Sequence, residues 1–202
     1  MKEQVRILHN PDISKVNGSF SAIFDPDGKM LIVRSIDGGG PEHPRGGHGE
    51  IELPGGGTDL DLDTDILSTA RRETIEESGI DILAGSTGIT VTALSRSRER
   101  AAYTGLIVVQ YDKPIPFNPD FRTHETSSVS LIEPKDLIGT PTFEEDPEAP
   151  CITYRAHRIM AAHALIMVQE GIDSIGPEML FPPFNDQRIA GHLSSHYDDC
   201  LS

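Results

Sequence analysis

The sequence predicts an α+β fold, an α/β/α sandwich in which helices flank a mixed β-sheet. Three observations lead to this prediction. Two short apolar segments surround the turn Asp25–Gly28, which is typical of a β-hairpin. A helix with an apolar and an acidic side begins near Asp63–Asp65 and stops at Gly79. Further apolar strands and a second helix at 153–169 then complete a sheet with helices to cover it.

Composition limits the class of protein. A chain of 202 residues suits one domain, which we expect over 1–170 with 171–202 as a C-terminal extension or cap. The 32 acidic against 17 basic residues give a net charge of −15, which argues against nucleic acid polymers and anionic membranes as partners. The chain shows no signal core or membrane-spanning run, and its two cysteines do not make a disulfide framework. We therefore expect a cytoplasmic protein, with a homodimer contact or an irregular cap as the open alternatives for the tail.

The first half of the chain is expected to supply the hairpin and the approach to the acidic helix. Residues 1–17 predict a short lead-in strand or arm, and 18–24 and 29–34 predict the two hairpin strands. The glycine-rich stretch 37–49 lacks the Gly-Lys-Ser/Thr of a phosphate loop, so an inter-strand loop is the better interpretation, with its histidines as a less favoured lid. Pro54 and Gly55–Gly57 predict a turn after a strand end.

The acidic helix carries three carboxylates at its C-terminal end. Glu73, Glu76 and Glu77 stand at positions i, i+3 and i+4, so they project from one side beside the apolar face. Like charges at this spacing repel, and the helix dipole disfavours anions at this end. A hard divalent cation would relieve both penalties. A solvated acidic face is the usual meaning of such a run, and the spacing alone leaves both interpretations open.

The surrounding motif resembles the box of the Nudix hydrolases. The segments ELPGGG (52–57) and RETIEESGI (72–80) are similar to that family's pattern G-x5-E-x7-R-E-U-x-E-E-x-G-U, in which U is a bulky aliphatic residue. The resemblance implies a Nudix-like fold, Mg²⁺ or Mn²⁺ as cofactor, and the three glutamates as metal ligands. It also implies that Arg72 orients these glutamates and that Gly56 and Gly57 shape the backbone beside the substrate.

Two positions depart from the family pattern. The sixth residue after Gly57 is Asp63 instead of Glu, and Arg72 lies nine residues further on instead of eight. The loop is thus one residue longer, with Asp63 or Thr64 where the first glutamate belongs. Thr74 also replaces the aliphatic residue that follows Arg-Glu. These departures put the loop geometry in doubt more than the metal site.

Beyond the helix, 87–94 and 105–111 predict two further strands, with an arginine-rich segment between them. Arg96, Arg98 and Arg100 alternate, so in an extended segment they would share one face and could bind the phosphates of a substrate. The alternative is an edge strand whose charges deter aggregation. We slightly favour the phosphate interpretation.

The second half offers one more candidate carboxylate. A short strand is expected within 124–132, and the family resemblance implies an acidic residue before it that approaches the metal, for which Glu125 is the candidate as ligand or base. A surface glutamate is the alternative. Residues 140–150 predict a linker without structure of its own, and 153–169 predict the second helix.

The function that follows from this resemblance is metal-dependent hydrolysis of the diphosphate bond in a nucleoside diphosphate linked to another moiety. One of Glu76, Glu77 and Glu125 would serve as the base. A nucleotide sugar, an ADP-ribose-like molecule and a dinucleotide are the open substrate classes. The alternatives are a Nudix-fold module that binds a nucleotide without turnover, and an acidic interaction protein in which the box is a coincidence.

Overall fold

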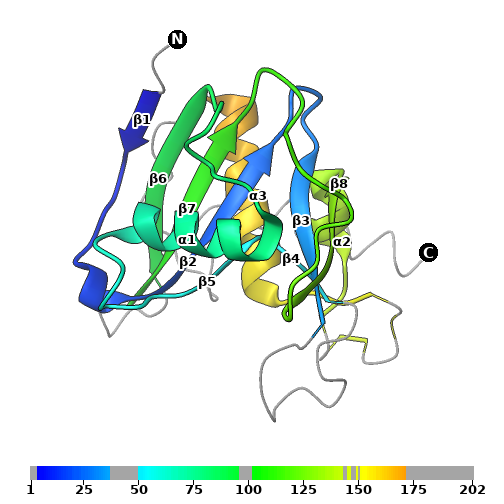
Figure 1. The fold of residues 1–202 in the computed structure, drawn as a ribbon, viewed down its shortest axis with the longest axis horizontal. Coiled ribbons are helices and arrows are strands. Elements are labelled where there is room, and N and C mark those ends of the chain that lie inside the picture. The colour runs from blue at the N-terminus through cyan, green and yellow to red at the C-terminus, as the bar shows by residue number, and fades with distance from the viewer. Residues whose placement is uncertain are drawn as a thin grey trace.

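The structure is a computed structural model, and it describes residues 4–36, 50–95, 102–142, 145, 146, 149 and 151–171. In this part of the chain, eight strands form one mixed sheet in the order β1-β6-β7-β2-β3-β4, while β5 pairs with β2 and β8 with β3. Helices lie on both sides of this sheet (Figure 1), so the predicted α/β/α arrangement is confirmed. The strands are β1 (Gln4–Ile7), β2 (Val16–Phe24), β3 (Met30–Ser35), β4 (Ile51–Glu52), β5 (Gly55–Gly57), β6 (Gly88–Ser95), β7 (Tyr103–Gln110) and β8 (Thr126–Ile132).

The helices divide the core into two layers. Helix α1 (Ile66–Ser78) packs with Ile66 and Ala70 on a cluster that includes Ile23 and Ile107. Helix α3 (Arg155–Glu170) and the short α2 (Pro134–Gly139) pack on the opposite face (Figure 1). Because successive residues of a strand point to opposite faces, Ile23 faces α1 while its neighbours Ala22 and Phe24 face α3. Both faces of the sheet are therefore buried. None of the helices in the described residues is long and apolar enough to cross a membrane.

The hairpin strands β2 and β3 meet only at their turn. Phe24 pairs with Met30, and the Asp25 carboxylate accepts hydrogen bonds from the backbone of Asp27 at 2.9 Å and Lys29 at 2.8 Å. Beyond the turn, β2 continues parallel to β7 and β3 antiparallel to β8. The segment 51–57 joins the two diverging strands, because β4 pairs with β3 and β5 pairs with β2. This crossing segment leads directly into the acidic loop and α1.

The turn predicted at Gly55–Gly57 is wrong, because these glycines form a short strand. They pair antiparallel with Gly18–Phe20 of β2. A Cβ on Gly55, whose φ is +152°, would lie 2.5 Å from the Cα of Phe20, so a side chain there is excluded. The glycine run thus allows close pairing of two backbones, and the chain turns later, in the acidic loop.

Most other predicted elements are confirmed. The expected lead-in segment contains β1 and a 3-10 helix at Ile13–Lys15, and the strands at 87–94 and 105–111 correspond to β6 and β7. Two details differ from expectation. Pro134–Gly139 forms the short helix α2. The predicted linker is tied down where it is described, because the buried Arg158 donates to the carboxylate of Glu145 at 2.6 Å.

Candidate active site

The ends of α1 are defined as the sequence predicted. The Asp65 carboxylate accepts the backbone N–H of Ser68 at 2.8 Å, and the Ser68 hydroxyl accepts the backbone N–H of Asp65 at 3.0 Å. This reciprocal cap fixes the first turn. Gly79 ends the helix with a φ of +73°, a left-handed conformation that favours glycine. The register of α1 therefore places Glu73, Glu76 and Glu77 on its last two turns.

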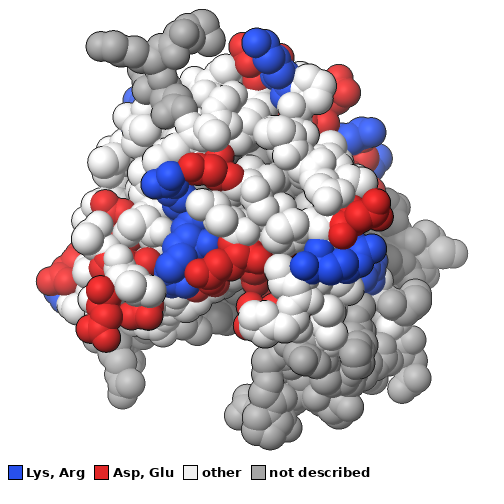
Figure 2. All heavy atoms as spheres, viewed as in Figure 1, with Lys and Arg blue, Asp and Glu red and all other residues white. Residues whose placement is uncertain are grey.

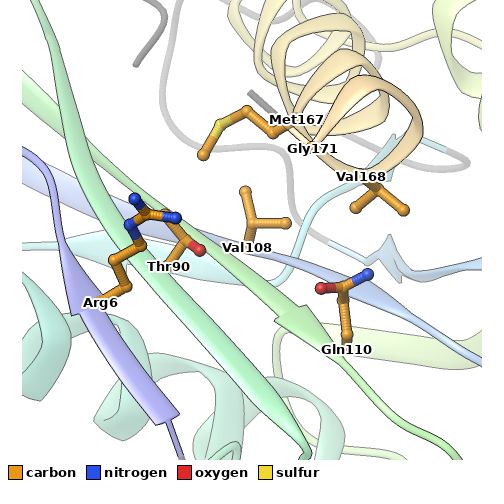
Figure 3. A pocket seen from close by; sticks show the side chains of 7 residues that line it. All are labelled: Arg6, Thr90, Val108, Gln110, Met167, Val168 and Gly171. Atoms are coloured by element: carbon orange, nitrogen blue, oxygen red, sulfur yellow. The ribbon is translucent and has the colours of Figure 1, made fainter. Parts of the chain in front are cut away.

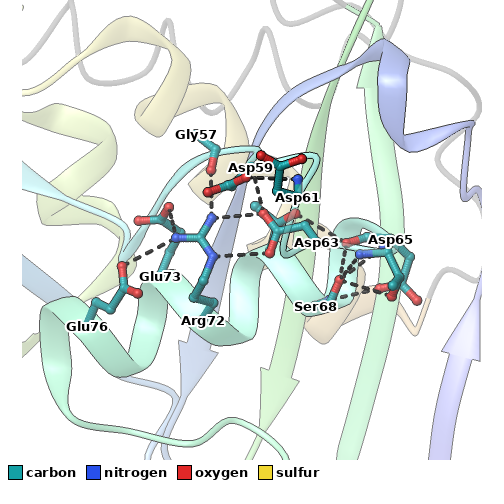
Figure 4. Close-up of polar contacts among 11 residues, drawn as sticks. Gly57, Asp59, Asp61, Asp63, Asp65, Ser68, Arg72, Glu73 and Glu76 are labelled. Atoms are coloured by element: carbon teal, nitrogen blue, oxygen red, sulfur yellow. Dashed lines mark hydrogen bonds and ion pairs between the residues drawn. The ribbon is translucent and has the colours of Figure 1, made fainter.

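Arg72 lies at the centre of a network of anions (Figure 4). Its guanidinium donates to both carboxylate oxygens of Asp63, at 3.1 and 2.8 Å, and to the carbonyl of Gly57 at 3.0 Å. It also donates to Glu73 at 2.6 Å and to Glu76 at 3.3 Å. Figure 2 shows acidic and basic side chains gathered side by side on the face that carries α1. The predicted ion pairing of Arg72 with the glutamates is present for two of the three.

The structure selects Asp63, not Thr64, as the residue that partners the box arginine. Asp63 is buried, and its carboxylate accepts two hydrogen bonds from the guanidinium of Arg72 and one from the backbone N–H of Asp59 at 2.9 Å. Burial raises the pKa of Asp63, but the hydrogen bonds of Arg72 and Asp59 outweigh it and leave that pKa lowered. Thr64 is exposed at the loop surface. The loop before α1, which is one residue longer than in the quoted pattern, thus pairs Arg72 with an aspartate where that pattern has a glutamate.

The second departure, Thr74, also has a partner. Thr74 is fully buried against the sheet, where its hydroxyl lies 2.8 Å from the hydroxyl of Ser21 on β2. A buried hydroxyl without a partner is costly, and this pair satisfies both groups. The polar residue in the apolar face of α1 is therefore matched by a polar residue in the sheet.

The glycine strand β5 runs beside the carboxylates of α1. The backbone N–H of Gly55 donates to the Glu77 carboxylate at 2.8 Å. A Cβ on Gly56 would lie 2.6 Å from the carboxyl carbon of Glu73, so the absence of a side chain lets that carboxylate approach the strand. A Cβ on Gly57 would meet its nearest atom, the carbonyl oxygen of Asn17, at 4.0 Å, so this position is open. Gly56 thus leaves space for a box glutamate, and its role beside the substrate stays a prediction.

Burial and neighbouring charges disfavour the ionised forms of two box glutamates. Burial raises the pKa of Glu77 to about 8, against the hydrogen bond from Gly55, and the charges of Glu52, Glu73 and Glu125 raise it further. Burial also raises the pKa of Glu73, with a contribution from the charge of Glu125. Glu125 is itself about half exposed, with the His124 ring 3.3 Å from its carboxylate. The charge of Glu125 thus acts on Glu73 and Glu77, while its role as ligand or base stays a prediction.

Two residues of this region were missed by the sequence reasoning. Glu52 on β4 has a pKa raised to about 7 by burial and by the charge of Glu50. His157 at the start of α3 accepts the backbone N–H of Leu53 at 2.9 Å and lies 3.8 Å from the Glu52 carboxylate. The alternation of Glu50 and Glu52 around a buried Ile51 is visible in the sequence. Nothing in the sequence indicates that a histidine 104 positions after Leu53 would reach it.

The donor set fits a hard divalent cation, although the carboxylates do not converge on one point. Among the described residues, no group of three or more His, Cys, Asp or Glu side chains is placed to hold a metal ion. Glu73 and Glu76 instead turn toward Arg72. The ligands at hand are carboxylate oxygens, which Mg²⁺ and Mn²⁺ prefer, and their raised pKa values reflect the need for a counter-charge.

Several predicted positions lie outside the described residues. These are Arg96, Arg98 and Arg100, the histidines of the glycine-rich loop, and the extension after Gly171. A separate hollow of about 220 Å³ lies between the sheet and α3, lined by Arg6, Gln110 and Met167 among others (Figure 3). Its lining from α3 places it on the face of the sheet opposite α1, so it takes no part in the carboxylate network.

Comparison with known proteins gives matches at the level of structure. No family model and no curated protein matches the chain. Among solved structures, it is similar to an Ap4A hydrolase from C. elegans, with 15% identity over 77% of this chain and 99% of that one and a TM-score of 0.47. It is also similar to the E. coli dihydroneopterin triphosphate pyrophosphohydrolase, with 11% identity over 82% of this chain and 99% of that one and a TM-score of 0.47. A third similar structure is a Nudix hydrolase from Nitrosomonas europaea, with 14% identity over 77% of this chain and 73% of that one and a TM-score of 0.46. At these identities and TM-scores the likeness supports no statement about activity, which depends on the residues of the site.

Proposed function

We propose that the protein is a Nudix-type pyrophosphohydrolase. With Mg²⁺ or Mn²⁺, it would cleave the diphosphate bond of a nucleoside diphosphate linked to another moiety, such as a sugar, an ADP-ribose-like group or a second nucleoside. The observation that carries the proposal is the network of the box: Arg72 binds Asp63, Glu73 and Glu76 together, while the glycine strand binds Glu77. An interaction protein with a coincidental motif would have no use for such an arrangement.

Glu73, Glu76 and Glu77 would hold the metal. A bound divalent cation would offset the charge of the diphosphate and lower the pKa of a water molecule. The chain's own residues would orient these ligands: Arg72 restrains Glu73 and Glu76, and the Gly55 amide restrains Glu77. Because Gly56 has no side chain, the carboxylate of Glu73 can lie against β5 where a Cβ would otherwise stand.

One carboxylate would take the proton of the attacking water as the phosphorus–oxygen bond of the diphosphate breaks. Glu76, Glu77 and Glu125 are the candidates. Glu76 and Glu125 are more than half exposed, at 56% and 57% of their side-chain surface, and so are open to a substrate. Glu77 is mostly buried and already bound by Gly55, which suits a ligand better than a proton carrier. Arg96 and Arg98 remain proposed phosphate contacts.

A second function, nucleotide binding without turnover, is favoured by one observation. The box arginine is paired with Asp63 on a loop that is one residue longer than the family pattern, so the entry to α1 differs from that of the enzymes it resembles. Intact Glu73, Glu76 and Glu77 favour the hydrolase.

Turnover separates the two functions. The purified protein is assayed with Mg²⁺ and with Mn²⁺ on ADP-ribose, nucleotide sugars, dinucleoside polyphosphates and nucleoside triphosphates. The double variant Glu76→Gln, Glu77→Gln is compared with Glu133→Gln. Glu133 is an exposed glutamate that lies between β8 and α2. Turnover that is lost only in the double variant supports the hydrolase. Binding of metal and nucleotide without turnover supports the binding module, and absence of metal binding contradicts both.

A further inference from the structure

A histidine from α3 is fixed against the strand that enters the box. The ring of His157 is buried, with 4% of the residue exposed, and its Nδ1 accepts the backbone N–H of Leu53 at 2.9 Å. The Phe20 ring meets it edge-on with a centroid distance of 4.8 Å, and the Tyr154 ring lies 5.7 Å away. A hydrogen bond and two rings therefore determine both the place and the rotation of the imidazole.

The hydrogen bond of Leu53 also determines the tautomer. Since Nδ1 accepts a hydrogen bond from the backbone N–H, it carries no proton of its own, and the neutral ring has its proton on Nε2. Nε2 lies 3.8 Å from a carboxylate oxygen of Glu52, longer than a hydrogen bond but close enough for a favourable charge–dipole contact. Nε2 of His157 thus lies near a carboxylate on the crossing segment.

Glu52 belongs by position to the same site as the box glutamates. Its strand pairs with Val33 of β3, and three residues later the N–H of Gly55 binds Glu77. The carbonyl of the intervening Pro54 accepts the backbone N–H of Ser21 at 2.8 Å, so the segment between Glu52 and Gly55 is held on the sheet. The side chain of Glu52 keeps 19% of its surface exposed, so it is not sealed inside the core.

We propose that Glu52 is a further carboxylate of the hydrolytic site and supports the binding of the metal together with Glu77. His157 is then the positioning residue that orients Glu52. This inference rests on the proposed function. A structural role alone for His157 would need only its bond to Leu53 and its packing on Phe20. The additional feature is the 3.8 Å separation of Nε2 from the Glu52 carboxylate, because histidines and carboxylates that lie together beside a metal ligand orient one another.

The test is Mn²⁺ binding to the full chain without nucleotide, measured from the electron paramagnetic resonance signal of free Mn²⁺. Glu52→Gln keeps the shape of the side chain and is expected to weaken Mn²⁺ affinity about tenfold, as loss of a supporting group at a metal site does. Glu133→Gln is the matched control and should leave the affinity unchanged. His157→Asn keeps an acceptor near the Nδ1 position but has no group at Nε2, so it should weaken Mn²⁺ binding, and the unfolding midpoint is measured beside it because the variant also loses the ring contacts with Phe20 and Tyr154.

Two further measurements separate positioning from packing. The double variant Glu52→Gln, His157→Asn should bind Mn²⁺ no more weakly than Glu52→Gln alone, because His157 acts through Glu52. Long-range ¹H–¹⁵N spectra of the wild-type protein should show His157 with its proton on Nε2, and the Nε2 shift should change in Glu52→Gln. This spectrum tests the positioning role even where a His157 variant fails to fold.

The outcomes are distinct. Wild-type protein that binds no Mn²⁺ would overturn the proposed hydrolase and this inference with it. Wild-type binding that is matched by Glu52→Gln would overturn the role of Glu52 and leave the hydrolase standing. A His157 ring protonated on Nδ1, or an Nε2 shift indifferent to Glu52→Gln, would overturn the role of His157.

Discussion

The three glycines of β5 allow a sharp test of how the site is built, because each would place a methyl group in a different environment. In Gly56→Ala the new Cβ meets the carboxylate of Glu73. The new Cβ would lie 2.6 Å from the carboxyl carbon of Glu73 and closer still to one of its oxygens, whereas ordinary contact begins at 3.4 Å, so the carboxylate must retreat by about 1 Å. The atoms in the way are the far end of a flexible side chain, so the fold can accommodate the change.

The expected result of Gly56→Ala is a folded protein with a damaged site. Loss of the Arg72–Glu73 contact costs about 1 kcal/mol or less at this half-buried position, and the stiffer unfolded chain offsets roughly 0.5 kcal/mol of it. Displacement of a ligand by about 1 Å, in contrast, can reduce turnover about 100-fold. The free energy of unfolding, Mn²⁺ affinity and turnover are measured on the same preparation.

The neighbouring glycines supply the controls. Gly57→Ala enters open space and should keep the wild-type free energy of unfolding and Mn²⁺ affinity. Gly55→Ala combines a φ of +152° with a collision against the backbone of β2, and should lose about 3 kcal/mol or more of stability. Gly56→Ala protein with wild-type Mn²⁺ affinity and turnover would refute the reasoning, since Glu73 would then not need to lie against the strand.

Three further results are expected. Thr74→Val should destabilise the protein by about 1–2 kcal/mol in urea unfolding, because it leaves the Ser21 hydroxyl unpaired, and adding Ser21→Ala should restore part of that loss; strictly additive effects would contradict the pairing. Burial lowers the pKa of His157 to about 3 from 6.5, so the unfolded chain binds a proton that the folded chain does not, and stability should fall as pH falls from 6.5 toward 3, by on the order of 5 kcal/mol in total. In His157→Asn the free energy of unfolding should fall less steeply as pH falls. An equally steep fall in the variant would mean that other groups cause the pH dependence. Burial raises the pKa of Glu52 to about 7 and of Glu77 to about 8 from 4.5, so metal-free protein should lose stability as pH rises from 4.5 through 8, and Mg²⁺ should raise the melting temperature more at pH 8 than at pH 6; a pH-independent Mg²⁺ effect would argue against these ligands.

The limits of the helix α1 and the placement of its glutamates could be read from the sequence. Capping by Asp65, termination at Gly79 and the i, i+3, i+4 spacing are local properties that depend on residues within a few positions of one another. The hairpin turn and the apolar strands β6 and β7 are equally local. For such elements, short-range hydrogen bonding and periodicity are enough to predict the outcome.

The glycine strand could not be predicted in this way. Gly55–Gly57 are typical of a turn, and only the pairing with Gly18–Phe20 shows that they lie flat on a neighbouring strand. The place of Thr74 could not be predicted either, because the hydroxyl on the apolar face of α1 is explained only by the hydroxyl of Ser21 opposite it. In both cases the partner comes from β2, more than thirty positions away in the chain.

Composition and neighbours along the chain are enough to predict the charge of the protein, the main elements of its sheet and helices, and the three carboxylates on α1. Only the folded chain shows that Asp63, and not Thr64, pairs with Arg72. It also places Glu52 and His157 beside the strand that enters the box, and it lets the charge of Glu125 act on Glu77. Burial between these elements raises the pKa values of Glu52 and Glu77, since a carboxylate loses water only when distant segments close around it.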